Sequence, residues 1–380
     1  MGRNPIRRNG RPASEDGDDR KSEIPEIAWI PADESPWRVP VLDVRPLTQT
    51  MLSTSSDPTC AANAVSFGPD DGTSFIGVEP AIARTTPASI RYRRDRLVAD
   101  GVLFTPDSME HKWAIFHHRG TLIFVRSWTR EVVATARLVQ SGDIAEVTEI
   151  RGALPFGTQE SPDLTVRSLD FLLRSHVLGL VWPVPLAPGQ ESDPKRAAMY
   201  CMSAFGKLAL VATPAPVTAE LPTKSLRSQS LLHIAVARGD RDAVDEQLAE
   251  GIPVDLLAGD GLAPLHWALS TKGTSMLEHL LSRRSPVDVR SAEGATPLMS
   301  AIQGDDLAQI EFFLSHGADA SASDARGFTS LHRAAEMGHL RAAELLLASG
   351  AYPYAEAQGQ SPLSLAEQRG HEEIVRILRR

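Results

Sequence analysis

Apolar residues in the last third of the chain recur at a fixed interval. Leucines stand 33 residues apart over four units, and a fifth follows after 32: Leu232, Leu265, Leu298, Leu331 and Leu363. A period of this length is typical of a solenoid, in which each unit buries its apolar face only by stacking on its neighbours. We therefore predict a linear stack of about five similar units over residues 228–380, the last of them a cap.

Each unit is predicted to contain two helices. One apolar position of the second helix is filled in turn by Val244, Leu277, Ile310, Ala343 and Val375. The first helix begins at a proline that follows a hydroxyl side chain, as at Thr296-Pro297 and Ser361-Pro362. Thr or Ser can accept a hydrogen bond from the free N–H groups of the first turn, and proline loses no bond there.

On these residues the segment resembles the ankyrin repeat family. The family pattern Thr-Pro-Leu-His-x-Ala is approached at residues 263–268, 296–301, 329–334 and 361–366. The resemblance covers residues 228–380 and implies an all-α solenoid that binds another protein through a groove and projecting turns. It also implies that His233, His266 and His332 tie neighbouring repeats together. Since no Cys or second His stands beside them at ligand spacing, we predict no metal site, and no cofactor.

The resemblance also indicates where a partner would bind. Variable positions on the groove side of the first helices are Ile234, Trp267, Ser300 and Arg333. Positions in the turns that project as fingers are Leu256, Leu257, Asp260, Arg290, Asp324 and Arg326. Because Trp and Arg are enriched among residues that carry binding energy, Trp267 and Arg333 are the leading candidates. The alternative for Trp267 is packing between repeats.

Residues 36–212 follow a different pattern and predict an α+β domain with an antiparallel sheet. Four β-rich runs follow one another, at residues 113–118, 121–128, 131–139 and 144–150. Arg119-Gly120 separates the first two runs, as in a hairpin. Helices are predicted at about residues 162–178 and from Asp193-Pro194 onward. We recognise no family for this domain.

The composition of the remaining segments predicts where the domains of the chain begin and end. Residues 1–35, rich in charged residues, Ser and Pro, predict a disordered tail. The proline-rich residues 213–227 predict a linker between the α+β domain and the repeats. The protein is therefore predicted to be multidomain, with an N-terminal α+β domain and a C-terminal all-α solenoid.

Charge and composition narrow the function. From residue 226 onward there are 14 Lys and Arg against 21 Asp and Glu, whereas the first 225 residues hold 25 against 27. Acidic repeats disfavour nucleic acid, whose phosphates need positive potential, and favour a protein partner. No apolar run is long enough for a bilayer and no secretory signal is present, so we expect no membrane attachment. Two cysteines without a disulfide framework favour the cytoplasm, and 33 Arg against 6 Lys favours a bacterial source.

One catalytic hypothesis concerns the N-terminal domain. Its sequence lacks phosphate loops, dinucleotide-binding glycines, nucleophile elbows and paired zinc motifs. Cys60, at a predicted helix start, precedes His111, and this order loosely resembles papain-like cysteine enzymes. A helix start favours the thiolate form of a cysteine, and a histidine can serve as its base. The alternative is a small buried cysteine and a histidine at a strand end, neither of them catalytic.

The predicted function is that of a scaffold or adaptor that binds a protein partner through the ankyrin groove and fingers. One alternative is a cysteine-dependent enzyme whose array recruits the substrate. The other is a stoichiometric inhibitor or immunity-type protein that neutralises its partner by binding.

Overall fold

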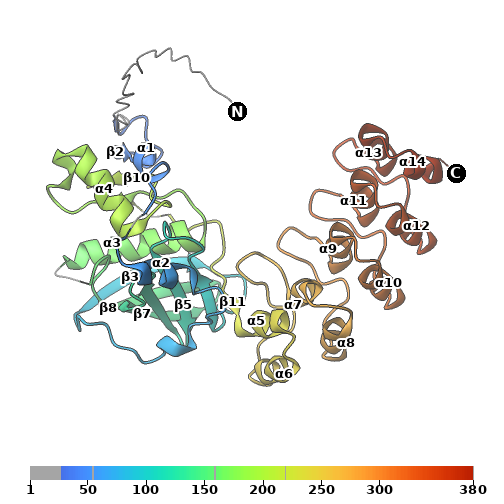
Figure 1. Cartoon of the computed structure of the whole chain (residues 1–380), viewed down its shortest axis with the longest axis horizontal. Helices are drawn as coiled ribbons and strands as arrows, with labels where there is room; N and C mark the ends of the chain where they lie inside the picture. The colour runs from blue at the N-terminus through green and yellow to red at the C-terminus, as the bar shows by residue number, and fades with distance from the viewer. Residues whose placement is uncertain (1–26, 54, 158–159, 219, 380) are drawn as a thin grey trace, which may run out of the picture.

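The computed structural model describes residues 27–53, 55–157, 160–218 and 220–379. Within them, a sheet-rich N-terminal domain is followed by a curved stack of helices (Figure 1). This is the predicted multidomain fold, with an α+β domain followed by an all-α solenoid. The first 26 residues of the predicted tail lie outside the described residues.

The N-terminal domain is built on a seven-stranded antiparallel sheet in the order β11-β4-β5-β6-β7-β8-β3. Its strands are β3 Thr85–Arg93, β4 Gly101–Phe104, β5 Trp113–His118, β6 Thr121–Arg126, β7 Val132–Ser141, β8 Ile144–Gly152 and β11 Gln229–Ser230. The predicted hairpin is confirmed, since β5 and β6 pair directly across Arg119-Gly120. Both turn residues have positive φ, which matches the right-handed twist of the strands.

Helices and a smaller sheet cover one face of this sheet (Figure 1). The helices are α1 Arg45–Thr48, α3 Pro162–Leu172 with a π-helical turn over Leu173–Val177, and α4 Pro194–Phe205 after a 3-10 turn at Gln190–Ser192. The smaller sheet, in the order β1-β2-β10-β9, contains β1 Trp29–Ile30, β2 Val41–Asp43, β10 Val211–Thr213 and β9 Val184–Pro185. The two helices predicted from residues 162 and 194 are confirmed. Strand β1 begins before residue 36, where the predicted domain starts.

The opposite face of the large sheet is only partly covered. Helix α2 (Pro58–Val65) and a 3-10 turn (Thr73–Phe75) flank a cluster in which Phe67, Phe75 and Phe116 stack with ring centroids 5.6–6.4 Å apart. This cluster is separate from the main core, which contains Trp113 and Phe205.

The C-terminal array consists of five helix pairs. They are α5 Leu231–Arg238 with α6 Arg241–Ala249, α7 Pro264–Trp267 (extended by a 3-10 turn, Ala268–Ser270) with α8 Ser275–Ser282, α9 Pro297–Gly304 with α10 Leu307–Ser315, α11 Ser330–Met337 with α12 Leu340–Ala348, and α13 Pro362–Arg369 with α14 Glu372–Leu378. The predicted caps at Thr296 and Ser361 are confirmed, because each side chain accepts a bond from the backbone N–H three residues on. The first helices line the inner side of the curve (Figure 1).

The two parts of the chain are joined by a packed junction. Strand β11, just before the first repeat, pairs with β4 of the domain sheet. This approach requires glycine at position 101, since a Cβ there would lie 2.2 Å from Gln229 O. The ion pairs Arg227–Asp95 (2.7 Å) and Arg96–Asp255 (2.5 Å) cross the same junction.

The predicted linker, residues 213–227, contacts the N-terminal domain near both of its ends. The Arg167 guanidinium donates to the carbonyls of Thr213, Pro214 and Ala215, and Leu226 is 1% exposed within the domain core. Its proline-rich composition indicates little regular secondary structure. The contacts of Thr213, Pro214 and Ala215 are not predictable from that composition, because Arg167, which binds their carbonyls, lies in an earlier helix.

Candidate functional site

Buried histidines join consecutive repeats of the array. The Nε2 atoms of His233, His266 and His332 lie 3.1–3.2 Å from a backbone carbonyl of the next repeat. The predicted structural role of these histidines is thereby confirmed. Burial lowers the pKa of His233 and of His266 to about 4, and it lowers the pKa of His332, so the rings are neutral at pH 7.

The groove position of the first repeat contacts the N-terminal domain. Ile234 packs against the cluster that contains Phe67, Phe75 and Phe116. Ile234 is half-buried at this contact, and its part in binding a partner stays a prediction. Its side chain is partly covered because the N-terminal domain packs against the first repeat, a contact that no sequence pattern within the repeats predicts.

Trp267, the equivalent position in the second repeat, is half-buried and linked to a finger. Its Nε1 donates to Asp260 Oδ2 at 3.0 Å. Its ring packs edge to face with the His233 ring, and the two ring centroids are 5.4 Å apart. Asp260 is exposed in the finger that follows the first repeat. Trp267 thus packs between repeats and also presents part of its ring beside an exposed carboxylate.

The fourth repeat holds a second polar group at the groove. Asp324 is 7% exposed and accepts from the N–H groups of Arg326 and Phe328. Arg333 Nη2 lies 3.5 Å from the same carboxylate. Arg326 extends over the Phe328 ring at 5.3 Å with 60% of its side chain exposed. Asp324 therefore stabilises the backbone of the finger through buried hydrogen bonds. The guanidinium groups of Arg326 and Arg333 lie closer to the surface, where they can contact a partner.

The other predicted finger residues divide by burial. Leu256 is 2% exposed, and Leu257 packs against the array core. Leu256 therefore packs inward and is not available to a partner, whereas Leu257 is half-buried and its contact with a partner stays a prediction. Arg290 is exposed and donates to the carbonyls of Gly294 and Ser323, bridging two fingers, and Ser300 is half-buried.

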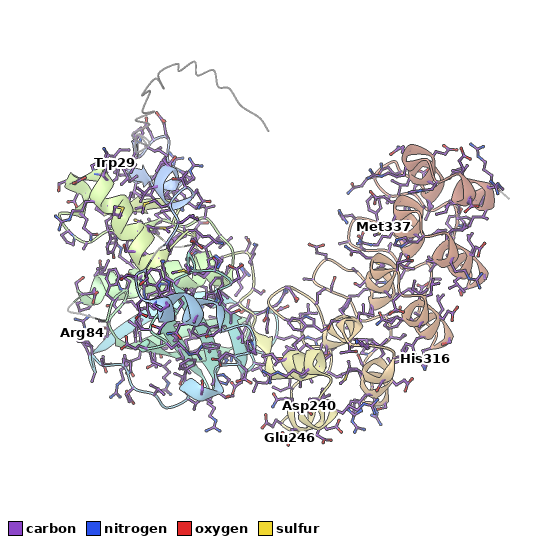
Figure 2. All side chains as sticks on the ribbon, viewed as in Figure 1. Trp29, Arg84, Asp240, Glu246, His316 and Met337 are labelled. Atoms are coloured by element: carbon purple, nitrogen blue, oxygen red, sulfur yellow. The ribbon has the colours of Figure 1, made fainter. Side chains whose placement is uncertain are left out.

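Sequence reasoning missed an exposed aromatic pair on the finger after the fourth repeat. Tyr352 and Tyr354 are 58% and 63% exposed, and their rings meet edge to face with centroids 5.8 Å apart. Met337, 44% exposed at the end of α11, lies on the inner side of the curve (Figure 2). The available signal in the sequence was that two of the chain's four tyrosines flank Pro353, after the second helix of the fourth repeat.

The two residues of the catalytic hypothesis are not joined in the structure. Cys60 is half-buried on α2, whereas the His111 ring packs edge-on against Phe104, and its Nδ1 lies 2.8 Å from Asp107 Oδ1. Burial, aided by Lys207, lowers the pKa of His111, while Asp107 opposes this shift. Among the described residues, no hydrogen bond connects Cys60 Sγ to the His111 ring, so the geometry gives the enzyme hypothesis no support.

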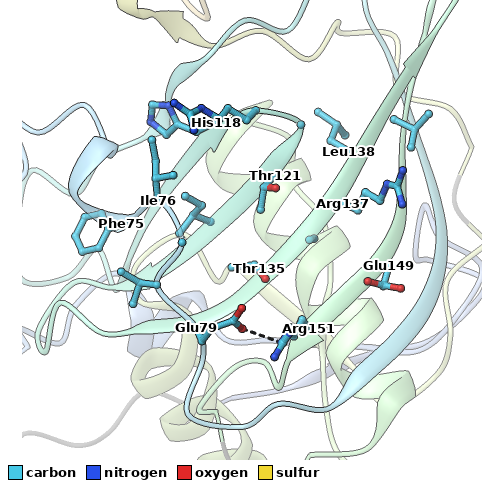
Figure 3. A pocket seen from close by; sticks show the side chains of 17 residues that line it. Phe75, Ile76, Glu79, His118, Thr121, Thr135, Arg137, Leu138, Glu149 and Arg151 are labelled. Atoms are coloured by element: carbon cyan, nitrogen blue, oxygen red, sulfur yellow. Dashed lines mark ion pairs between the residues drawn. The ribbon is translucent and has the colours of Figure 1, made fainter.

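A depression of about 700 Å³ lies on the partly uncovered face of the large sheet (Figure 3). One wall is the segment after Phe75, and the floor is formed by strands β6, β7 and β8. Its Glu79 and Arg151 pair across the depression at 2.8 Å, and Arg137 and Glu149 also line it. The depression therefore carries both acidic and basic side chains, and its charge favours neither an anionic nor a cationic ligand.

Two kinds of site are absent from the described residues. In the described part of the chain, no three His, Cys, Asp or Glu side chains converge in a way that could hold a metal ion. No helix among those residues combines the length and apolarity that crossing a membrane requires.

The stacked helix pairs define a repeat solenoid of the kind used to bind other proteins. Residues 232–324, 271–357 and 306–380 each match the family model for ankyrin repeats in three copies, so residues 232–380 are ankyrin repeats. No family model matches the N-terminal region. No curated protein matches the chain. The repeats support a protein–protein interaction module over the C-terminal part of this protein.

Proposed function

We propose that the chain is a scaffold or adaptor that holds one protein partner against the inner side of the ankyrin array. The exposed Tyr352–Tyr354 pair is the observation that carries this proposal. Tyrosines supply large contact area at low entropic cost and are enriched among the residues that carry binding energy at interfaces. Arg326 and Arg290 extend the same row of fingers with exposed guanidinium groups.

The charge of the array favours a neutral or basic protein surface as the partner. The repeats carry 21 acidic against 14 basic residues from position 226 onward. Nucleic acid is disfavoured by the same balance, since phosphates would meet a net negative surface. Two free cysteines, one of them buried, fit a reducing compartment, and we propose the cytoplasm as the place of action.

The N-terminal domain acts in this proposal as a fixed base. The pairing of β11 with β4 and the packing of Ile234 hold the first repeat against the domain. A partner that fits the inner side of the array therefore meets a preformed surface, which limits the entropy lost on binding. The full chain, rather than the isolated array, is the appropriate protein for binding experiments.

The test is affinity capture with the full chain and with a Tyr352→Ala/Tyr354→Ala double variant. Both tyrosines are exposed, so the array should stay folded while partner capture falls at least about tenfold. Leu307→Ala is the matched control, because Leu307 is also exposed, at 38%, but begins the outer helix α10. A partner retained equally by wild type and double variant would contradict the proposed surface.

The activity of the captured partner distinguishes two modes of action. An adaptor binds its partner and leaves the partner's activity intact. A stoichiometric inhibitor forms a one-to-one complex in which that activity is lost. Measuring the activity of the purified partner with and without the chain separates these modes.

A further inference from the structure

A cavity of about 380 Å³ opens in the N-terminal domain beside α4. Segments far apart in the sequence form it: Ser53, Lys112 just before β5, Arg126 at the end of β6, and Ser203 near the end of α4. Its size is that of pockets that hold small organic ligands, which are mostly apolar with a few placed polar groups.

Two cationic side chains line this cavity. Lys112 is 3% exposed, and its Nζ donates to Ser53 Oγ at 2.5 Å and to Met109 O at 2.7 Å. The Arg126 guanidinium donates to the carbonyls of Ala204, at 2.7 Å, and Ser203. An ammonium group has three N–H donors and a guanidinium five, so both cations retain donors beyond these bonds. Among the described residues, no carboxylate lies within 4 Å of either group as an ion-pair partner.

The two positive charges disfavour each other. Burial, and then Arg126, lower the pKa of Lys112 to about 8, and Glu110 and Cys60 only partly oppose this shift. Burial lowers the pKa of Arg126 to about 10. An anion placed between the two groups would compensate charges that the chain itself leaves uncompensated.

The entrance of the cavity is apolar and exposed. Leu52, Phe156 and Met199 line it, and they are 75%, 42% and 44% exposed. Inside, the Lys112 ammonium lies 3.8 Å from the centre of the Trp128 ring, and the Arg126 guanidinium lies 5.6 Å from the centre of the Phe156 ring. Apolar side chains that gather at the mouth of a cavity indicate a ligand that covers them.

We propose that this cavity binds an apolar carboxylate, with the carboxylate between Lys112 and Arg126 and the apolar body against Trp128, Phe156 and Leu52. A singly charged head matches the few remaining donors, and the walls match a hydrocarbon or aromatic body. The ligand is either a free acid or the C-terminal residue of a peptide, since both offer this chemistry.

The first test compares an acid with its uncharged analogue. In calorimetric titration of the full chain at pH 7, 3-phenylpropionate should bind at least about tenfold more tightly than 3-phenylpropanamide, because only the acid makes charge-assisted bonds. Equal affinities, or no binding of the acid at millimolar concentration, would overturn the proposal. A tripeptide ending in phenylalanine with a free carboxylate, compared with its amidated form, distinguishes a chain terminus from a free acid as the natural source.

Two variants locate the bound acid. Lys112→Met removes one charge at similar length and should weaken binding of 3-phenylpropionate about tenfold or more. Leu52→Asp places a negative charge at the entrance on a side chain too exposed to affect folding, and it should have a similar effect. Val181→Asp is the matched control in the same domain, at 54% exposure, and should bind as wild type does. Wild-type affinity in Leu52→Asp would overturn the assignment even if Lys112→Met failed to fold.

Discussion

The contacts that stabilise the array and those that stabilise the N-terminal domain differ in how far apart their residues lie in the sequence. In the array, stabilising contacts join each repeat to the next, as when His233 bonds to the carbonyl of Leu262, 29 residues on. In the N-terminal domain, Thr48 bonds to Ala209 across 161 residues and Thr213 to Pro40 across 173. Damage to the array should therefore remain near its site, whereas damage to the domain should spread through the whole of it.

The largest effect is expected from the core of the N-terminal domain. Trp113 is fully buried, and its Nε1 donates to Ala204 O at 2.8 Å. Trp113→Ala should lower the free energy of unfolding by about 3–5 kcal/mol, because it leaves a large cavity in the core and removes a buried hydrogen bond. Hydrogen exchange followed by mass spectrometry should show lost protection across β5, β6 and α4, while α9–α12 stay protected.

Trp29→Ala is the control for this prediction. Trp29 is half-buried on the edge strand β1 (Figure 2), so its truncation should cost clearly less. Equal loss of protection in the domain and the array after Trp113→Ala would show that the two parts unfold as one unit, and the contrast in contact range would then have no consequence for stability.

The junction between the two parts gives the next effect. Ile234→Asp places a carboxylate against Phe67, Phe75 and Phe116 and should cost about 2–3 kcal/mol. Small-angle X-ray scattering should then show a broader range of overall dimensions, because the array is freed from its base. Ser300→Asp is the matched control, since Ser300 holds the same repeat position two units on and is half-buried at the inner side. Unchanged scattering for Ile234→Asp would contradict a rigid junction.

The same difference in contact range decides what sequence alone could predict. The helix pairs, the caps at Thr296 and Ser361 and the histidine bonds were predictable because their partners lie within one repeat or the next. The hairpin at Arg119-Gly120 was predictable for the same reason.

The missed features depend on residues distant in sequence or on burial within a finger. Ile234 is partly covered by residues more than 100 positions earlier in the chain, and the cavity at Lys112 is lined by Ser53 and Ser203. Leu256 lies in a predicted finger, yet it is 2% exposed because it packs inward. No periodicity marks these contacts.

Acid should weaken the array through its buried histidines. The pKa of His266 is about 4 in the folded chain and near 6.5 when unfolded, so the unfolded chain takes up the proton first. Its stabilising contribution is complete above pH 6.5 and is lost as pH falls toward 4. At pH 5 this histidine alone accounts for a loss of about 2 kcal/mol relative to pH 7. Urea unfolding of wild type and His266→Asn at both pH values measures this difference, and an identical pH dependence in the two proteins would refute it.

A smaller effect is expected at the helix caps. Thr296 is buried and its hydroxyl accepts from Met299 N at the start of α9. Thr296→Ala should cost about 1 kcal/mol, measured as a shift of the urea midpoint at constant slope. Ser300→Ala, one turn later and outside the cap, should shift the midpoint less.

The smallest effect has the opposite sign and uses a natural departure from the repeat pattern. Ala263 stands where the other repeats have Thr or Ser, and α7 has no side-chain cap and spans only Pro264–Trp267. In the fourth repeat, Thr329 Oγ1 lies 2.9 Å from His332 Nδ1 as well as capping its helix. Ala263→Thr should recreate both contacts with His266 and stabilise the array by about 0.5–1 kcal/mol. Because Ala263 is 1% exposed, a loss of stability instead would show that the added methyl group does not fit between the stacked repeats.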